Sequence, residues 1–322
     1  MNTPAATPPA GQLGVVKLSL IIPLYNEAAV FGQLQERLLK ALPLLPAPVE
    51  VLLVNDGSAD ETGALVSQLC REDARFVGVH LSRNFGHQLA VCAGLDLCRG
   101  EAVAVLDGDL QDPPEILPEF YAKLREGFDV VYAIRRKRKE NPLLRFFYWA
   151  FYRLLAAMTP INIPLDSGDF GIMSRRVVEV LKTMPERRRF VRGMRSYVGF
   201  RQTGLAYDRH ERAGGRSKYT LGKLITLAAD GIFTFSETPL RLATCAGFSA
   251  AGISLLYGGY LCVWRLRSGT DLPGFTTLAV GLFFLGGVQL ICLGILGEYI
   301  GRIHHEVKQR PPYLIERVER AP

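Results

Sequence analysis

Short hydrophobic runs alternate with amphipathic stretches along the first 125 residues of the chain. The hydrophobic runs predict four buried strands, at residues 18–22, 49–54, 76–81 and 102–106. The stretches between and after them predict helices, at residues 27–42, 61–70, 88–98 and 115–125. Alternation at this spacing is typical of an α/β domain, and it predicts a parallel sheet with right-handed crossovers.

Polar side chains stand where three of these strands end, at residues 23–27, 55–58 and 107–111. The carboxyl ends of the strands form the edge at which an open α/β sheet binds its ligand. In an extended backbone, residues i and i+2 share a face, so Asp107, Asp109 and Gln111 are expected to point the same way. Their oxygens suit a hard divalent cation, Mg²⁺ or Mn²⁺, whereas a solvated Asp-rich turn is the alternative interpretation.

Two long segments near the C-terminus, residues 242–264 and 274–297, contain no charged residue. As a helix, each would be about 35 Å long, which exceeds the ~30 Å of hydrocarbon in a bilayer. They predict two transmembrane helices, at about 240–264 and 274–298, although two buried core helices would show the same pattern.

The segments around the spans predict an orientation in the membrane. Residues 1–16 are expected to be disordered, and they lack the charged and apolar regions of a signal peptide. The α/β domain, residues 17–238, should therefore stay in the cytoplasm, and two spans within residues 239–301 return the tail, 302–322, to the same side. The positive-inside rule agrees, because the cytoplasmic flanks carry more basic residues (Arg241, Arg302, Lys308 and Arg310) than the outer loop (Arg265 and Arg267).

Two further apolar segments, at about residues 143–158 and 219–235, are shorter than a typical span. They are predicted to be interfacial helices that lie in the headgroup plane, with ordinary core helices as the alternative. A basic run at residues 135–139 precedes the first of them and favours the membrane location, because each basic residue near an anionic surface adds about 1 kcal/mol.

Charge and short motifs narrow the classes of function. A net charge of +7 fits nucleic acid, an anionic membrane surface or phosphorylated substrates equally well. The pattern G-x-G-x-x-G does not follow the first strand and G-x-x-x-x-G-K-[ST] occurs nowhere, which argues against a dinucleotide oxidoreductase or a P-loop ATPase. The six cysteines show no metal-binding spacing and are interpreted as reduced, structural thiols.

Seven motifs stand in order along the chain: P-L-Y-N-E, V-N-D-G-S-A-D, S-R-N-F-G-H-Q, L-D-G-D-L-Q-D-P-P-E, S-G-D-F, R-A-G-G-R-S-K-Y and G-E-Y-I-G-R. Together they resemble the family 2 glycosyltransferases with the Rossmann-like GT-A fold. The resemblance is closest to the bacterial polyisoprenyl-phosphate type, the O-antigen glucosylation (bactoprenol glucosyltransferase) enzymes. Dolichol-phosphate mannose synthase and the undecaprenyl-phosphate aminoarabinose transferase are its cousins. The match covers about residues 17–313.

This resemblance implies an enzyme of the bacterial inner membrane, with its catalytic domain and both termini cytoplasmic. It implies metal-dependent, inverting transfer of a sugar from a nucleotide sugar, UDP-glucose or a related UDP-sugar, to polyprenyl (undecaprenyl) phosphate. Its relatives form tetramers, so a homotetramer in contact with membrane lipids is expected, and no nucleic-acid partner. The alternatives are a polysaccharide synthase of the same family, whose Q-x-x-R-W signature is absent, and a catalytically degenerate nucleotide-sugar-binding protein, which the intact D-x-D-x-Q disfavours.

The resemblance also assigns roles to residues. It implies that donor contacts to the base and ribose come from Pro23, Tyr25, Glu27 and Asp56, and that Asp109 and Gln111 hold the metal. Asp107 is implied to contact the metal or the donor ribose. A Gly-rich loop is expected to close over the diphosphate with Arg212, Ser217 and Lys218. Arg216 departs from the family, which usually has an acid there.

The acceptor is expected to meet basic residues and a carboxylate. Arg135, Arg136 and Arg138 are candidates for the lipid phosphate, because guanidinium groups bind phosphate in a bidentate manner; a membrane-surface role is the alternative. Asp169 is implied to be the catalytic base, with Asp166 as its neighbour. A phosphomonoester has a second pKa of about 6, so the acceptor hardly needs a base, and Asp169 would repel it unless arginines or the metal intervene. Gly171 replaces the usual arginine of the family and puts a paired charge in doubt.

Overall fold

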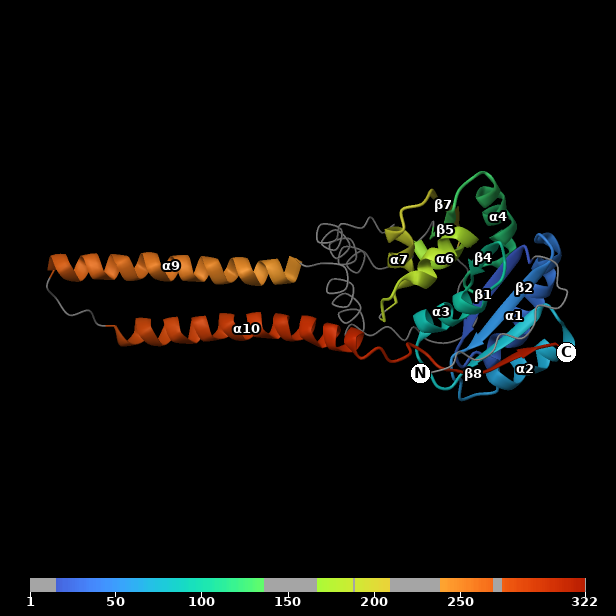
Figure 1. The fold of residues 1–322 in the computed structure, drawn as a ribbon, viewed down its shortest axis with the longest axis horizontal. Coiled ribbons are helices and arrows are strands. Elements are labelled where there is room, and N and C mark those ends of the chain that lie inside the picture. Colours follow the sequence, from blue (N-terminus) through green and yellow to red (C-terminus); the bar gives the residue numbers. More distant parts are fainter. Residues whose placement is uncertain (1–15, 136–166, 188, 209–237, 269–273, 322) are drawn as a thin grey trace. The chain divides into compact units, whose positions relative to one another are not determined.

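The structure, a computed structural model, describes residues 16–135, 167–187, 189–208, 238–268 and 274–321. These residues fall into two units. The first contains the described residues up to 208 together with residues 310–321, and the second contains two long helices, α9 (Thr238–Ser268) and α10 (Phe275–Val307). Each unit is described by itself below (Figure 1).

The first unit is built on a mixed sheet with the strand order β7-β5-β6-β4-β1-β2-β3-β8. The four strands predicted from the hydrophobic runs are confirmed as β1 (Leu18–Leu24), β2 (Val49–Asn55), β3 (Phe76–Leu81) and β4 (Ala102–Val105). They are parallel to one another, as expected. The other strands are β5 (Val130–Arg135), β6 (Ser167–Ser174), β7 (Gln202–Tyr207) and β8 (Ile315–Arg320).

Two strands outside the predicted set run in the opposite direction. β6 runs antiparallel to both β4 and β5, and β8 runs antiparallel to β3. Both strands lie beyond the region in which hydrophobic runs alternate with helical stretches, so the sequence pattern carried no information about their direction. Strand β6 matters for function, because it adds Asp169 to the sheet beside the end of β4.

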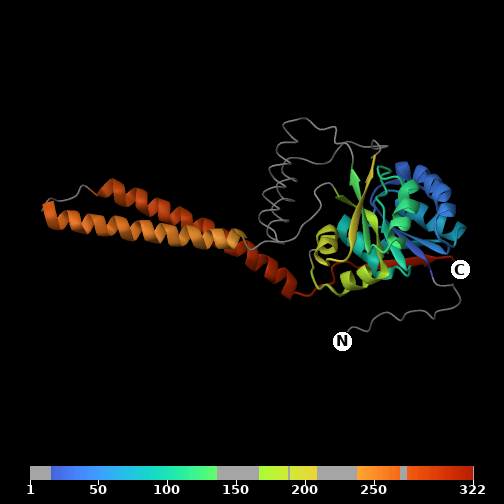
Figure 2. The same ribbon diagram turned by 90° about the horizontal axis from the view of Figure 1, so that it is seen from above.

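Helices cover both faces of this sheet (Figure 2). One face packs against α1 (Ala28–Ala41), α2 (Thr62–Glu72) and α4 (Leu117–Arg125), and the other against α3 (His87–Leu97), α6 (Arg175–Thr183) and α7 (Val191–Tyr197). Short 3₁₀ turns, η1 (Leu42–Leu44) and η2 (Pro114–Ile116), follow α1 and precede α4. Because side chains alternate along a strand, Leu20 and Ile22 of β1 enter the first core and Ile21 enters the second.

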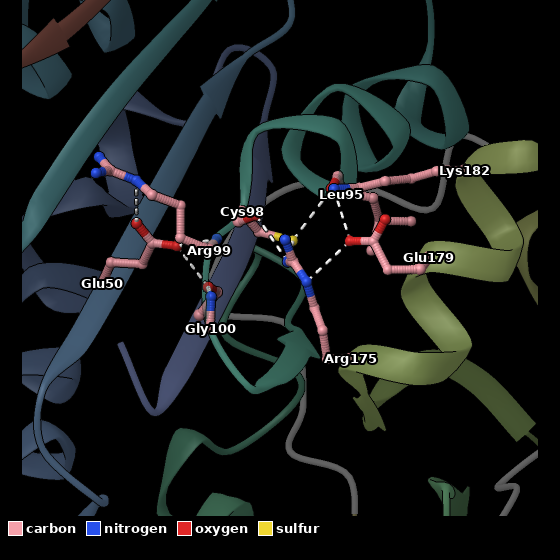
Figure 3. Close-up of polar contacts among 9 residues, drawn as sticks. Glu50, Leu95, Cys98, Arg99, Gly100, Arg175, Glu179 and Lys182 are labelled. Carbon is pink, nitrogen blue, oxygen red and sulfur yellow. Dashed lines mark hydrogen bonds and ion pairs between the residues drawn. The ribbon is translucent and has the colours of Figure 1, made fainter. Parts of the chain in front are cut away.

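A polar network connects the amino-terminal ends of the strands, away from the carboxyl ends where a ligand is expected (Figure 3). The buried Glu50 carboxylate of β2 accepts hydrogen bonds from the Ser19 hydroxyl of β1 and from the Arg99 N–H, at 2.6 Å for the latter. Arg175, the first residue of α6, donates to the carbonyl of Cys98 at the end of α3 at 2.8 Å and pairs with Glu179 at 2.9 Å. This network stabilises the amino-terminal ends of the strands and does not involve their carboxyl ends.

Strand β8 is a feature that the sequence did not predict, since residues 302–322 were expected only to form a tail. It pairs with the edge strand β3, and the Tyr313 hydroxyl just before it contacts Asp96 of α3. Residues that follow α10 in the chain thus belong to the same sheet as residues that precede α9.

The second unit has the properties predicted for membrane spans. Residues Thr238–Leu261 and Phe284–Val307 are long and apolar enough to cross a bilayer, and neither window is buried in the structure. Large side chains such as Leu255, Leu256 and Phe284 are more than half exposed. The predicted interfacial helices, at about 143–158 and 219–235, lie outside the described residues.

Candidate active site

The acidic segment after β4 is a turn and not an extended strand. β4 ends at Val105, and Leu110 adopts a left-handed backbone conformation with φ of 62°. The Gln111 N–H donates to Asp109 Oδ1 at 3.2 Å, while the Leu110 side chain is buried in the core. The extended backbone that was expected to align Asp107, Asp109 and Gln111 is therefore absent, and these residues lie instead in a turn whose Leu110 side chain is buried in the core.

Asp107 is the half-buried first residue of this acidic turn. Its Oδ1 atom has no hydrogen-bond partner among the described residues. Burial raises the pKa of Asp107 to about 6; the charge of His87 opposes the rise, and the charges of Asp112, Asp169 and Asp109 add to it. Such a cluster of carboxylates is stabilised by a cation.

The donor set of the acidic turn fits a hard divalent ion. No described group of three or more His, Cys, Asp or Glu side chains is arranged to hold a metal by itself. Mg²⁺ is usually bound through one or two carboxylates, waters and substrate phosphates instead of a full protein cage. Asp107, Asp109 and the Gln111 amide offer a partial set of this kind.

Four side chains of alternating charge lie next to one another beside the turn. Asp107 Oδ1 is 3.6 Å from His87 Nε2, and His87 Nε2 is 3.4 Å from Asp169 Oδ2. On the other side, Asp169 Oδ1 is 3.5 Å from Arg192 Nε. They come from the end of β4, the first turn of α3, β6 and the first turn of α7. We call Asp107, His87, Asp169 and Arg192 the charge row.

Asp169 is the most tightly held member of the charge row, with a side chain only 10% exposed. Gln88 Nε2 donates to Asp169 Oδ2 at 2.7 Å. Burial alone would raise the pKa of Asp169, but the contact with His87 and the charges of Arg192 and Arg195 hold it well below its usual range. Asp169 is therefore a fixed anion.

His87 is the complementary fixed cation. Burial lowers its pKa, but the contact with Asp169 and the charge of Asp107 outweigh that effect and raise the pKa to about 9. A protonated imidazole between two carboxylates keeps both of them in place.

The donor end of the site is formed by the loops after β1 and β2. Asp56 is buried, and its two oxygens accept the N–H groups of Phe85 and Gly86 at 2.7 and 2.9 Å. Burial raises the pKa of Asp56, and these two hydrogen bonds oppose the rise. Asp56 thus sets the loop that leads into His87, in addition to any contact with a donor.

The two loops are joined by further polar contacts. The Ala59 N–H donates to Asn26 Oδ1 at 2.8 Å, and the Asn26 N–H donates to Ser58 Oγ at 3.0 Å. Gly57 has φ of 62°, and a Cβ there would lie 2.3 Å from the Arg83 carbonyl carbon, so only glycine fits this turn. Of the predicted donor residues, Pro23 is buried next to the end of β1, Glu27 is half-buried and Tyr25 is exposed.

Several predicted site residues cannot be located in this arrangement. Arg135 is the last residue of β5, in register with Tyr207 of β7, and its side chain is outside the description. The others that lie outside the described residues are Asp166, Arg136, Arg138, Arg212, Ser217 and Lys218.

Four residues of the site were not assigned a role from the sequence: His87, Gln88, Arg192 and Arg195. The motif S-R-N-F-G-H-Q contains the first two, and its position before a predicted helix could have indicated that they belong to the site. Arg195 is buried and donates to the Gly168 carbonyl at 3.2 Å. Nothing in the sequence around Arg192 and Arg195 indicates that they approach β6.

Comparison with known proteins identifies the family. Residues 19–182 match glycosyl transferase family 2, and residues 238–303 match the GtrB C-terminal hairpin. The chain is 44% identical over 301 residues to the uncharacterized glycosyltransferase sll0501 of Synechocystis sp., covering 93% of this chain and 95% of the relative. It is 41% identical over 307 residues to the SfII prophage-derived bactoprenol glucosyl transferase of Shigella flexneri, covering 95% and 99%.

A solved structure of the mannosyltransferase PcManGT from Pyrobaculum calidifontis, in complex with GDP-Man and Mn²⁺, is similar with a TM-score of 0.43 and 17% identity, covering 88% of this chain and 87% of that one. The matched family region runs from β1 into α6 and includes the acidic turn and Asp169. With its GT-A-like mixed α/β sheet, the chain is a glycosyltransferase that belongs to glycosyl transferase family 2.

Proposed function

We propose that this protein transfers a sugar from a nucleotide sugar, UDP-glucose or a related UDP-sugar, to polyprenyl phosphate. The observation that carries this proposal is the charge row at the carboxyl ends of the strands, in a chain that also has two helices long enough to cross a membrane. A nucleotide sugar and a lipid phosphate are both anionic, and the site offers partners for each. The relative from Shigella flexneri, named a bactoprenol glucosyl transferase, supports a lipid acceptor.

In this proposal the acidic turn serves the leaving group. A divalent metal, held by Asp107, Asp109 and Gln111, would supply Lewis-acid neutralisation of the diphosphate when bound. An oxygen of the acceptor phosphate attacks the anomeric carbon as the bond to the nucleoside diphosphate breaks, so the configuration inverts. The loops that carry Tyr25, Glu27 and Asp56 would hold the base and ribose.

Asp169 is better suited to positioning than to proton abstraction. A general base works best with a pKa near the working pH, whereas the pKa of Asp169 lies well below its usual range. The acceptor phosphate is largely dianionic at pH 7–8 and supplies its own nucleophilic oxygen. Asp169 then orients the groups around it.

The order of the strands in the sheet supports the proposed membrane arrangement. Because β1 to β7 precede α9 and β8 follows α10 in one sheet, both ends of the helical hairpin belong on the same side of the membrane. Nucleotide sugars are cytoplasmic, so that side is proposed to be the cytoplasm of a bacterial inner membrane. A homotetramer stays a prediction.

The test is product analysis with the purified full-length protein. Incubation with a UDP-sugar, Mg²⁺ and polyprenyl phosphate should release UDP only when the lipid is present. Mass spectrometry should find the lipid heavier by one hexosyl residue, because its own phosphomonoester has become a phosphodiester to the sugar. Binding of the nucleotide sugar without UDP release would support the degenerate binding protein instead. A growing polymer would support a polysaccharide synthase.

A further inference from the structure

Asp169 raises an electrostatic problem for the proposed function. A phosphate that approaches this carboxylate as a dianion is repelled unless a cation stands between or beside them. The metal cannot serve both substrates equally, because the acidic turn that would hold it lies at the other end of the charge row. His87 is a cation beside Asp169, but it stands between Asp169 and Asp107 and is shared by both carboxylates. A phosphate on the other side of Asp169 therefore needs a cation of its own.

Arg192 is placed to be that cation. Its Nε atom lies 3.5 Å from Asp169 Oδ1, and its side chain is 25% exposed. The guanidinium carbon stands 5.6 Å from the centre of the Phe190 ring, which restricts its plane. No described residue accepts a hydrogen bond from its terminal nitrogens, so the guanidinium touches Asp169 along one edge and has donors to spare for a phosphate.

The order of charges in the row separates the two substrates. Asp107 and the acidic turn stand at one end, and Arg192 stands at the other, with His87 and Asp169 between them. The diphosphate of the donor belongs with the metal at the first end. An anion at the Arg192 end is then a second one, and the acceptor of the proposed reaction is the substrate that brings it.

Hydrogen bonds of the residues around Arg192 fix the start of α7 against α3 and the sheet. Gln88 uses both ends of its amide: it donates to Asp169 and accepts the Val191 N–H at 2.9 Å. Three residues further along α7, buried Arg195 donates to the carbonyl of Gly168, next to Asp169. The first turn of α7 is thus tied to the same carboxylate that Arg192 contacts, which gives the site a preorganised geometry.

We infer that Arg192 binds the phosphate of the acceptor beside Asp169. This inference rests on the proposed function, because it takes polyprenyl phosphate as the second substrate. Arg192 would cancel the repulsion between Asp169 and the acceptor, and Asp169 in turn would hold the guanidinium in place.

The experiment compares kinetics of the full-length protein with those of three variants, Arg192→Gln, Arg192→Lys and Arg176→Gln. Arg176 is the matched control, since it is exposed on α6 and stacks on Phe200 at 4.4 Å away from the charge row. Initial rates are measured with polyprenyl phosphate varied at saturating UDP-sugar, and then with UDP-sugar varied at saturating lipid.

Arg192→Gln should raise the KM for polyprenyl phosphate by roughly tenfold or more and leave the KM for UDP-sugar within about twofold. Arg192→Lys should lie between Arg192→Gln and the unsubstituted protein, because it keeps the charge but loses the bidentate geometry. Arg176→Gln should match the unsubstituted protein. If Arg192→Gln does not fold, the lysine variant still gives the same split between the two KM values.

Two results would overturn the inference. A rise in the KM for UDP-sugar would assign Arg192 to the donor diphosphate, and a fall in kcat with both KM values unchanged would leave Arg192 only as a support for Asp169. Failure of the proposed function looks different. In that case the unsubstituted protein transfers no sugar to polyprenyl phosphate, which overturns the inference together with its premise before any variant is compared.

Discussion

At the scale of single residues, the acidic turn gives the first test of metal dependence. Asp109→Ala should reduce turnover by more than the roughly 10–100-fold that the loss of an outer-shell partner of a metal costs. The variant should still fold, because Asp109 is only half-buried in a turn. EDTA should abolish the activity of the unsubstituted protein, and Mg²⁺ or Mn²⁺ should restore it in a UDP-release assay. Full activity in excess chelator would exclude a metal at this turn.

Asp169 gives the second test at this scale. Asp169→Asn should lower turnover by about 10²-fold, with the affinity for UDP-sugar little changed. The pKa of Asp169 lies well below its usual range, so the residue is ionised throughout pH 6–9 and the loss should be the same across that range. The measurement is kcat for both proteins at each pH. A loss that shrinks as the pH rises would instead mark Asp169 as a base for the monoanionic acceptor.

The residues that sequence reasoning missed are those whose roles depend on distant contacts. Asp109 and Asp169 could be found because each stands in a short motif. Gln88 acts on Asp169 from 81 positions away and on Val191 from 103 positions away. A pattern confined to neighbouring residues carries no record of such a contact.

At the scale of elements, a substitution in the polar network at the amino-terminal edge should lower the stability of the protein without lowering its catalytic activity. Glu50→Ala removes the acceptor of the Ser19 hydroxyl and the Arg99 N–H, which are then left unpaired. We expect the free energy of unfolding to fall by about 1–3 kcal/mol, measured by denaturant titration in detergent. Glu36→Ala, on the exposed face of α1, is the control and should leave the midpoint unchanged.

Activity of Glu50→Ala below its unfolding transition should stay close to that of the unsubstituted protein, since the site lies at the other ends of the strands. A drop in kcat with an unchanged denaturation midpoint would contradict the view that this network stabilises the fold and takes no part in catalysis.

Buried strands could be predicted from the sequence, whereas an exposed edge strand could not. β1 to β4 are covered on both faces and therefore appear in the sequence as hydrophobic runs. β8, with the sequence I-E-R-V-E-R, is charged and mostly exposed, as edge strands often are. Neither its existence nor its partner β3 could be inferred from that composition.

At the scale of the whole molecule, labelling of single cysteines tests the orientation. In a background without the native cysteines, Ser268→Cys at the end of α9 should react with a membrane-impermeant maleimide added to the periplasmic side. Ser58→Cys and Arg320→Cys should react only after the membrane is opened, because both belong to the sheet unit. Reaction of Ser58→Cys from the periplasm would reverse the proposed topology and remove access to cytoplasmic UDP-sugars.

Strand β8 also has a consequence for how the protein is made. Residues 315–320 leave the ribosome only after both long helices have been synthesised, yet their partner β3 is made among the first 81 residues. Domains generally begin to fold from their N-terminal end during synthesis. In the proposed topology, β3 therefore keeps an open edge while the hairpin is inserted into the bilayer. On that proposal, closing the edge is a late step of biogenesis, and it occurs only in chains whose hairpin has returned to the side on which it entered.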